Sequence, residues 1–347
     1  MTSAESPELV ALLANRRVAV LTGAGISTDS GIPDYRGPDS PPSNPMTIRQ
    51  FTSDPVFRQR YWARNHVGWR HMDDTLPNAG HRSLATLEHA GVVTGVITQN
   101  VDLLHTKAGS ANVVNLHGTY AEVICLSCGY TVSRAALAEQ LEALNPGFLE
   151  RSNAIGGLAV APDADAIVDD TASFRYLDCP RCAGMLKPDI VYFGENVPKD
   201  IVAQSYSLVG EADALLVVGS SLTVFSGYRF VRHAAALGLP VAIVNRGPTR
   251  GDELATVKVD GGCSELLVLL ASELGAPDTA PHTKGPDPLW AGSSFRVDSA
   301  AEAPVPVHGN AVAVDLAVHP VRGVDRGGVG RTGEPEGGKS EAGGQQG

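Results

Sequence analysis

Four uninterrupted apolar runs stand out along the chain. They are Val18–Thr22, Val92–Thr98, Ala214–Gly219 and Val241–Asn245. None of the runs alternates polar with apolar residues, which is typical of parallel strands covered on both faces. Stretches with helical character, such as Gly80–Ala90 and Tyr228–Leu237, lie between them. The pattern predicts an α/β fold with a doubly wound parallel sheet of the Rossmann-like kind.

Two segments interrupt this alternation, and the two ends of the chain differ from it. Residues from about 37 to 78 are rich in Pro, Asp, Arg and aromatic residues, and we interpret them as a helical insertion. Residues from about 121 to 186 carry four cysteines and predict a metal-binding insertion. We expect a flexible N-terminus over 1–8 and one catalytic domain over 9–273. The Gly-, Ala- and Pro-rich residues 274–347 predict a disordered tail, because they cannot bury enough apolar surface to offset the entropy of ordering.

Composition narrows the possible partners. Hydrophobic residues make up 43% and charged residues 19% of the chain, so a sizeable core can form. The formal net charge of −11 disfavours a nucleic-acid partner and would attract lysine-containing substrates. The first residues lack the pattern of a secretory leader, and no apolar run is long enough to span a bilayer. We therefore expect a soluble, cytoplasmic protein that does not bind membranes.

A glycine-rich string, Gly23 to Arg36, follows the first apolar run directly. Glycines at a strand-to-helix turn allow the backbone to approach a pyrophosphate. A tight turn that needs positive φ would use the same glycines. Thr28 stands where the dehydrogenase fingerprint would have its third glycine, so that fingerprint is not met.

Polar residues also end the second apolar run. Gln99, Asn100 and Asp102 fall at the carboxyl end of a predicted strand, the edge where open α/β sheets bind ligands. Such side chains suit a ribose and a carboxamide, although helix capping would also use one of them. His117 lies after another short apolar run, Val113–Leu116, and a neutral imidazole there could act as a general base. A lone histidine is more often structural or merely exposed.

Two Cys-x-x-Cys pairs indicate a zinc site. The pairs are Cys125 with Cys128 and Cys179 with Cys182. Four thiolates close a tetrahedral coordination shell, so this zinc would be structural. A redox-active pair is the alternative, but a thioredoxin-like context is missing. Cys263 stands alone, and we expect a packed thiol or one near the cofactor.

Taken together, these strings resemble the sirtuin family of NAD-dependent protein deacylases. The matching strings are GAGISTDSGIPDYR, TQNVDLLH, LHG, the paired CxxC, KPDIVYFGE and GSSL, in family order between about Val18 and Leu270. Tyr35 in PDYR and the string SGYR at Ser226 to Arg229 are most similar to class II sirtuins. A dehydrogenase would need a different fingerprint, and a zinc-ribbon interaction protein would need only the cysteines.

The resemblance implies roles for residues of this chain. NAD would be bound by Gly23, Ala24, Gly25, Asp34, Arg36, Gln99, Asn100, Val101, Asp102, Gly219, Ser220, Ser221, Asn245, Arg246, Gly247 and Cys263. The substrate would be bound by Val191, Phe193 and Gly194 as an added strand and by the Tyr61 and Arg64 pair, which share a helical face and would select the acyl group. His117 and Asn100 would be catalytic.

The resemblance also implies the reaction. The acyl group of an acylated lysine protein would pass to ADP-ribose with release of nicotinamide, and NAD would be consumed beside one structural zinc ion. An ADP-ribosyltransferase or a lipoamidase-type deacylase is the alternative. The sequence does not decide the preferred acyl group or the oligomeric state.

Overall fold

The computed structural model describes residues 5–37, 40, 45–153, 166, 168 and 171–274. Its main body is a parallel sheet of six strands in the order β3-β2-β1-β7-β8-β9. The strands are β1 Val18–Thr22, β2 Val93–Thr98, β3 Val113–Asn115, β7 Ala214–Val218, β8 Val241–Val244 and β9 Val257–Val259. The predicted Rossmann-like sheet is confirmed, and the four apolar runs are its central strands.

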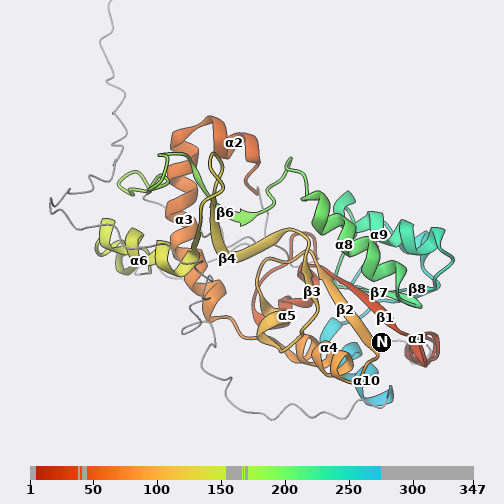
Figure 1. Cartoon of the computed structure of the whole chain (residues 1–347). Coiled ribbons are helices and arrows are strands. Elements are labelled where there is room, and N and C mark those ends of the chain that lie inside the picture. Colours follow the sequence, from red (N-terminus) through yellow and green to blue (C-terminus); the bar gives the residue numbers. More distant parts are fainter. Residues whose placement is uncertain are drawn as a thin grey trace, which may run out of the picture.

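Helices cover both faces of this sheet, as Figure 1 shows. One layer contains α1 Glu5–Leu13, α4 Ala79–His89 and α10 Cys263–Glu273, and the other contains α8 Lys199–Gly210 and α9 Phe225–Ala236. Successive residues of β1 point to opposite layers. Val18 and Val20 pack with α1, α4 and α10, whereas Ala19 and Leu21 pack with α8 and α9. A strand buried on both faces therefore needs apolar residues at every position.

The strand order places a switch point at the centre of the sheet. The chain runs outward from β1 through β2 to β3 and then returns to the other side of β1 as β7. The loops that follow β1 and β7 therefore leave the same sheet edge in different directions. Such a crevice is the usual ligand site of an open α/β sheet.

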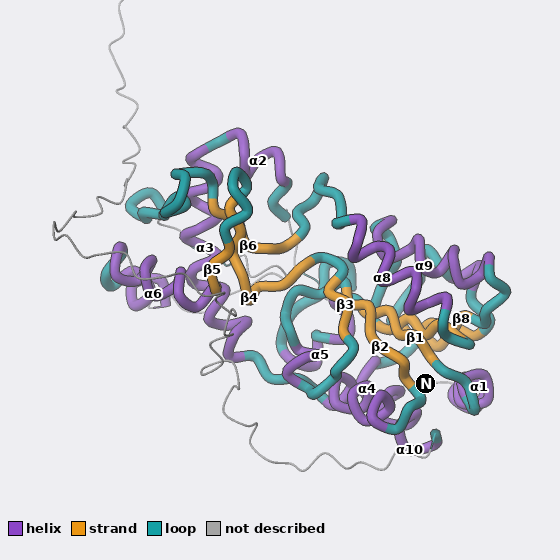
Figure 2. Tube along the Cα trace, viewed as in Figure 1, coloured by secondary structure: helices purple, strands orange, loops and turns teal. Residues whose placement is uncertain are grey.

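A smaller module lies beside the sheet, and Figure 2 shows its own strands and helices. Its antiparallel sheet has the order β5-β4-β6, with β4 Gly118–Cys125, β5 Thr131–Ser133 and β6 Leu186–Ile190. The helices α2 Ile48–Ser53, α3 Pro55–Asp74, α6 Arg134–Leu144 and α7 Phe148–Asn153 belong to it, and α5 Leu104–Lys107 lies nearer the main sheet. The helical insertion and the cysteine-bearing insertion share one apolar core, which includes Phe51, Trp62 and Leu137.

The chain ends differ partly from the sequence-based boundaries. α1 begins at Glu5, within the segment expected to be flexible, because Leu9 and Leu13 are buried against the sheet. The expected tail over 274–347 lies outside the described residues from 275 onward. Within the described part of the chain, no helix is long and apolar enough to cross a membrane.

Candidate active site

A cavity of about 720 Å³ opens where the loops after β1, β2 and β7 meet the small module. Most of the residues predicted to bind NAD line it. They are Gly23, Ala24, Gly25, Asp34, Arg36, Gln99, Asn100, Val101, Asp102, Gly219, Ser220, Ser221, Asn245, Arg246 and Gly247. His117, Val191, Phe193 and Gly194 line the same cavity. The fold thus brings five of the six family-like strings to one place, all but the paired CxxC.

The glycine loop after β1 packs directly on the loop after β7. The amide of Gly25 donates to the carbonyl of Gly219 at 2.9 Å, and the amide of Gly23 donates to Val218 at 3.1 Å. A Cβ atom added at Gly25 would lie 2.9 Å from the Gly219 Cα. Gly219 has φ of +63°, which favours glycine. The result is a cradle of bare backbone at the cavity wall, which fits a pyrophosphate.

The polar residues after β2 form a connected network. The Asn100 amide nitrogen donates to the Gly23 carbonyl at 3.0 Å and to the Ser27 hydroxyl at 3.1 Å. The Ser27 hydroxyl donates to the Asp102 carboxylate at 2.7 Å. Because the nitrogen of Asn100 is used by the protein, its amide oxygen is the group left to meet a ligand. Burial raises the pKa of Asp102, and the hydrogen bond from Ser27 opposes that rise.

His117 lies between β3 and β4 and lines the cavity. Its Nδ1 is 2.8 Å from the Gln99 carbonyl oxygen, and its Nε2 is 2.8 Å from the Ser226 hydroxyl oxygen. Burial lowers the pKa of His117, the Gln99 hydrogen bond raises it, and the charge of Arg229 lowers it. The net shift is downward, so the imidazole is neutral near pH 7 and can accept a proton. Gly118 follows with φ of +77°, and a Cβ there would overlap the Asp189 carbonyl, so both the backbone conformation and the space require glycine.

The segment after β6 also borders the cavity. The amide of Val191 donates to the His117 carbonyl at 2.8 Å, and the carbonyl of Phe193 accepts from Ile48 at 3.0 Å. Phe193 is 37% exposed and meets the ring of Tyr35 edge-on, with centroids 6.2 Å apart. Within the described chain, the Val191 carbonyl and the Phe193 amide remain for an added strand.

Three predicted site residues do not line the cavity. Cys263 is buried at the start of α10, and burial raises its thiol pKa to about 12. Tyr61 is fully buried in α3, and its ring lies 5.5 Å from that of Tyr192, which does line the cavity. Tyr61 therefore stands behind the cavity wall, and Arg64 is not among the lining residues. Their spacing in the sequence predicts that the two residues share a helical face, but it does not predict which residues pack over that face.

Among the cavity residues without a role assigned from the sequence, two carry polar side chains at the start of one helix. Ser226 and Arg229 lie near the start of α9 and line the cavity. The string SGYR marked them only as a subgroup signature. A hydroxyl and a cation one helical turn apart, just after a glycine loop, are the signal that could have identified them.

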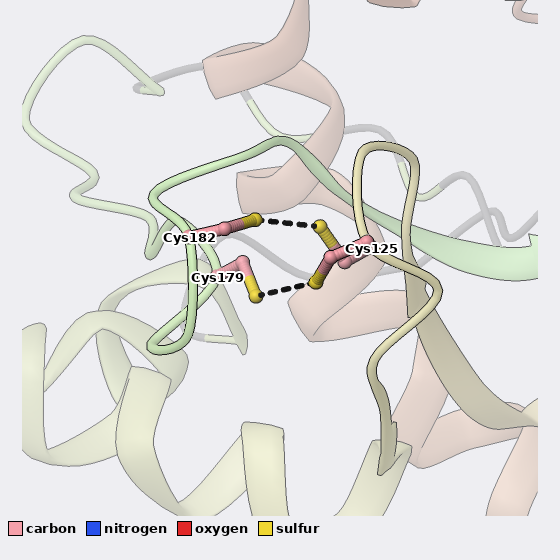
Figure 3. A group of neighbouring side chains, drawn as sticks. Cys125, Cys179 and Cys182 are labelled. Atoms are coloured by element: carbon pink, nitrogen blue, oxygen red, sulfur yellow. Dashed lines mark hydrogen bonds between the residues drawn. The ribbon is translucent and has the colours of Figure 1, made fainter.

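The four paired cysteines form a separate cluster in the small module. Their sulfur atoms all lie within 4.8 Å of one another. Cys125 and Cys182 are 3.6 Å apart and Cys128 and Cys179 are 3.7 Å apart, measured between sulfurs. A tetrahedral zinc with Zn–S bonds of about 2.3 Å needs sulfurs about 3.8 Å apart. Figure 3 shows Cys179 and Cys182 on one loop facing Cys125 on the other, so the residues fit a structural zinc.

Comparison with known proteins agrees with this geometry. The model of the Sir2 family matches residues 23–226. The chain is 84% identical over 271 residues to "NAD-dependent protein deacetylase 1" of Mycobacterium avium (strain 104), covering 78% of this chain and 96% of that protein. It is 45% identical over 263 residues to "NAD-dependent protein lipoamidase sirtuin-4, mitochondrial" of Homo sapiens, covering 74% of this chain and 82% of the relative.

A solved structure described as "Sir2-p53 peptide-NAD+" superposes with a TM-score of 0.62 at 32% identity, covering 77% of this chain and 97% of the other. The structure described as "Structure of Sir2Tm bound to a propionylated peptide" has a TM-score of 0.62 at 31% identity, covering 78% and 99%. These findings establish the α/β fold of an NAD-dependent enzyme. The chain belongs to the Sir2 family.

Proposed function

We propose that this protein is an NAD-dependent protein lysine deacylase. The observation that carries the proposal is a single cavity that joins a bare-backbone cradle, a neutral buried histidine and a strand edge. Each part alone is common, but together they meet the needs of a reaction between a dinucleotide and a peptide. The names of the relatives and of the solved structures support the same activity.

NAD fits the cavity on two counts. The backbone of Gly23, Gly25 and Gly219 leaves room that side chains would fill, and Arg36 and Arg246 supply positive charge at the wall. Bound NAD would supply an electrophilic ribose carbon and nicotinamide as the leaving group. Asn100 would offer its amide oxygen to the nucleotide, while its nitrogen is held by Gly23 and Ser27.

The protein's own residues would bind and orient the acylated lysine. The segment Val191 to Gly194 would pair with the peptide as an added strand. The Tyr35 and Phe193 rings would keep water from the reacting groups at the cavity mouth. His117 would accept the proton of the hydroxyl that attacks the acyl carbon, because its imidazole is neutral and held in one orientation by Gln99.

The acyl group is the open part of the proposal. The relative named as a lipoamidase, at 45% identity, favours lipoyl-lysine as a candidate substrate. The Tyr61 and Arg64 pair would influence acyl choice only through the cavity wall, by way of Tyr192. The cytoplasmic location expected from the sequence stays a prediction.

Nicotinamide release from NAD tests the proposal directly. We expect release to depend on an acylated lysine peptide, and a panel of acetyl, lipoyl and dicarboxylic acyl peptides would rank the acyl groups. Transfer of labelled ADP-ribose to protein without lysine deacylation would instead favour an ADP-ribosyltransferase. Release that is equal with acylated and unmodified peptide would contradict a deacylase.

A further inference from the structure

Ser226 is held against the imidazole of His117 by the docking of α9. It is the second residue of that helix, it is 9% exposed, and its oxygen is 2.8 Å from the His117 Nε2. The next residue, Gly227, packs on Gln99, where an added Cβ would lie 2.6 Å from Oε1. The Gln99 amide nitrogen is fixed in turn by Ser220 at 2.8 Å. The start of α9 and the end of β2 therefore hold the Ser226 hydroxyl within hydrogen-bond distance of the His117 imidazole.

The direction of each hydrogen bond at His117 follows from its partners. The carbonyl of Gln99 can only accept, so Nδ1 carries the proton. In the neutral imidazole, Nε2 is then an acceptor with one lone pair in the ring plane. The Ser226 hydroxyl must donate to it. The lone pair that a general base needs is thus already occupied by the Ser226 proton.

The surroundings of Ser226 favour negative charge on its oxygen. Arg229 lies one helical turn further on and lines the same cavity. Its Nε is buried and has no hydrogen-bond partner within the described chain. The start of α9 has no side-chain cap, so its amide dipoles also point toward this region. An oxygen that briefly loses its proton would be stabilised here.

We propose that Ser226 is a catalytic residue that relays the proton from the attacking hydroxyl to His117. In this step the O–H bond of the attacking hydroxyl breaks and its proton binds the Ser226 oxygen. The original Ser226 proton moves to the His117 Nε2 at the same time. The freed oxygen bonds to the acyl carbon, which by then is joined to the ribose carbon through its own oxygen, and the electron pair of its double bond to the lysine nitrogen moves onto that nitrogen. Ser226 ends with one proton, as it began, and His117 becomes an imidazolium ion. The relay rests on the proposed deacylase function.

The test compares Ser226→Ala with Ser226→Thr, which keeps a hydroxyl. Ser207→Ala, an exposed serine on α8, is the matched control. We expect the alanine variant to lose at least about tenfold in acyl transfer, as part of the 100- to 10,000-fold that general-base assistance typically contributes. The threonine variant should recover most of that loss. NAD affinity and the acyl-peptide-dependent release of nicotinamide in the first turnover, which precedes the relay, should stay near wild type in both.

A second readout does not depend on turnover. In the enzyme without nucleotide, the ¹⁵N shift of the His117 Nε2 should change in Ser226→Ala, because the nitrogen loses its donor, and should stay near wild type in Ser226→Thr. In the wild-type enzyme, the rate of acyl transfer should fall along a curve and not a straight line as the D₂O fraction rises, because two protons move together. The D₂O measurement, which uses only the wild-type enzyme, keeps the relay testable even if the alanine variant does not fold.

Several outcomes would overturn the relay. If the nucleotide simply displaces Ser226, the alanine variant would turn over as fast as wild type or faster and would bind NAD more tightly. An unchanged His117 shift, or a linear dependence on D₂O, would also contradict it. If wild-type nicotinamide release does not depend on acyl peptide, the proposed function fails together with the relay. If acyl transfer is unaffected in Ser226→Ala but abolished in His117→Ala, the relay fails and the proposed function stands.

Discussion

His105 provides a quantitative test of how the buried core responds to acid. Its imidazole is 1% exposed, its Nε2 is 2.9 Å from the Thr22 hydroxyl, and its ring lies 4.8 Å from that of His81. Burial lowers the pKa of His105 to about 3 and places the pKa of His81 well below its usual range. His105 is therefore neutral in the folded protein at pH 5, whereas an unfolded histidine titrates near pH 6.5.

The direction of the stability change with pH follows from proton uptake by the folded and unfolded chains. As pH falls below about 6.5, the unfolded chain binds protons at these histidines and the folded chain does not, so stability declines between about pH 6.5 and pH 3. At pH 5 the pH lies about 1.5 units below the pKa of an unfolded histidine. Protonation of His105 in the unfolded chain therefore lowers the free energy of unfolding by about 2 kcal/mol, at about 1.36 kcal/mol per unit. His81 contributes in the same direction.

Urea unfolding at about pH 7.5 and pH 5.0 gives the stability that each protein loses on acidification. The effect of His105 is the wild-type loss minus the loss of the variant. Wild type should lose stability on going to pH 5.0, and His105→Gln should lose about 2 kcal/mol less. His71→Gln, an exposed position on α3, is the control and should lose as much as wild type. Any protonation of the zinc thiolates at pH 5.0 is common to all three proteins and cancels. An equal loss in wild type and His105→Gln would refute the burial argument.

Three further changes have defined outcomes. Arg229→Gln removes a charge that lowers the pKa of His117, so the acid limb of the kcat/KM profile should move to higher pH, and an unmoved limb would contradict this. Cys128→Ala should lose zinc and melt at a lower temperature, while Cys263→Ala should retain the metal by elemental analysis. Retained zinc in Cys128→Ala would count against a four-thiolate site. Truncation before Pro281 should leave melting and turnover unchanged, and a large loss of either would show that the tail contributes to the core.

The sequence predicted the central strands well because each is a continuous apolar run. Val18–Thr22 matches β1 residue for residue, since both faces of that strand are buried. α1 was not foreseen, because Leu9 and Leu13 acquire their role only by packing on a distant sheet. β9 is only Val257–Val259, too short a run to distinguish from a loop.

The candidate site also divides into residues that local sequence identifies and residues that only tertiary packing brings into place. Local motifs identified the glycine loop and the residues after β2, because their chemistry depends on neighbours in sequence. Tyr61 and Cys263 were placed at the site on motif position alone, and packing puts both behind the cavity lining. Ser226 could not be linked to His117, because 109 residues separate them and only the docking of α9 brings them together.

The central claim is that His117 is the base of an NAD-dependent deacylation, and His117→Ala tests it most directly. With melting and zinc content equal to wild type, turnover of an acyl-lysine peptide should fall on the order of 100- to 10,000-fold. NAD affinity, measured on the same preparation, should stay near wild type, because the imidazole bonds to Gln99 and Ser226 and not to the glycine cradle. A well-folded His117→Ala variant that turns over within a few-fold of wild type would contradict the account.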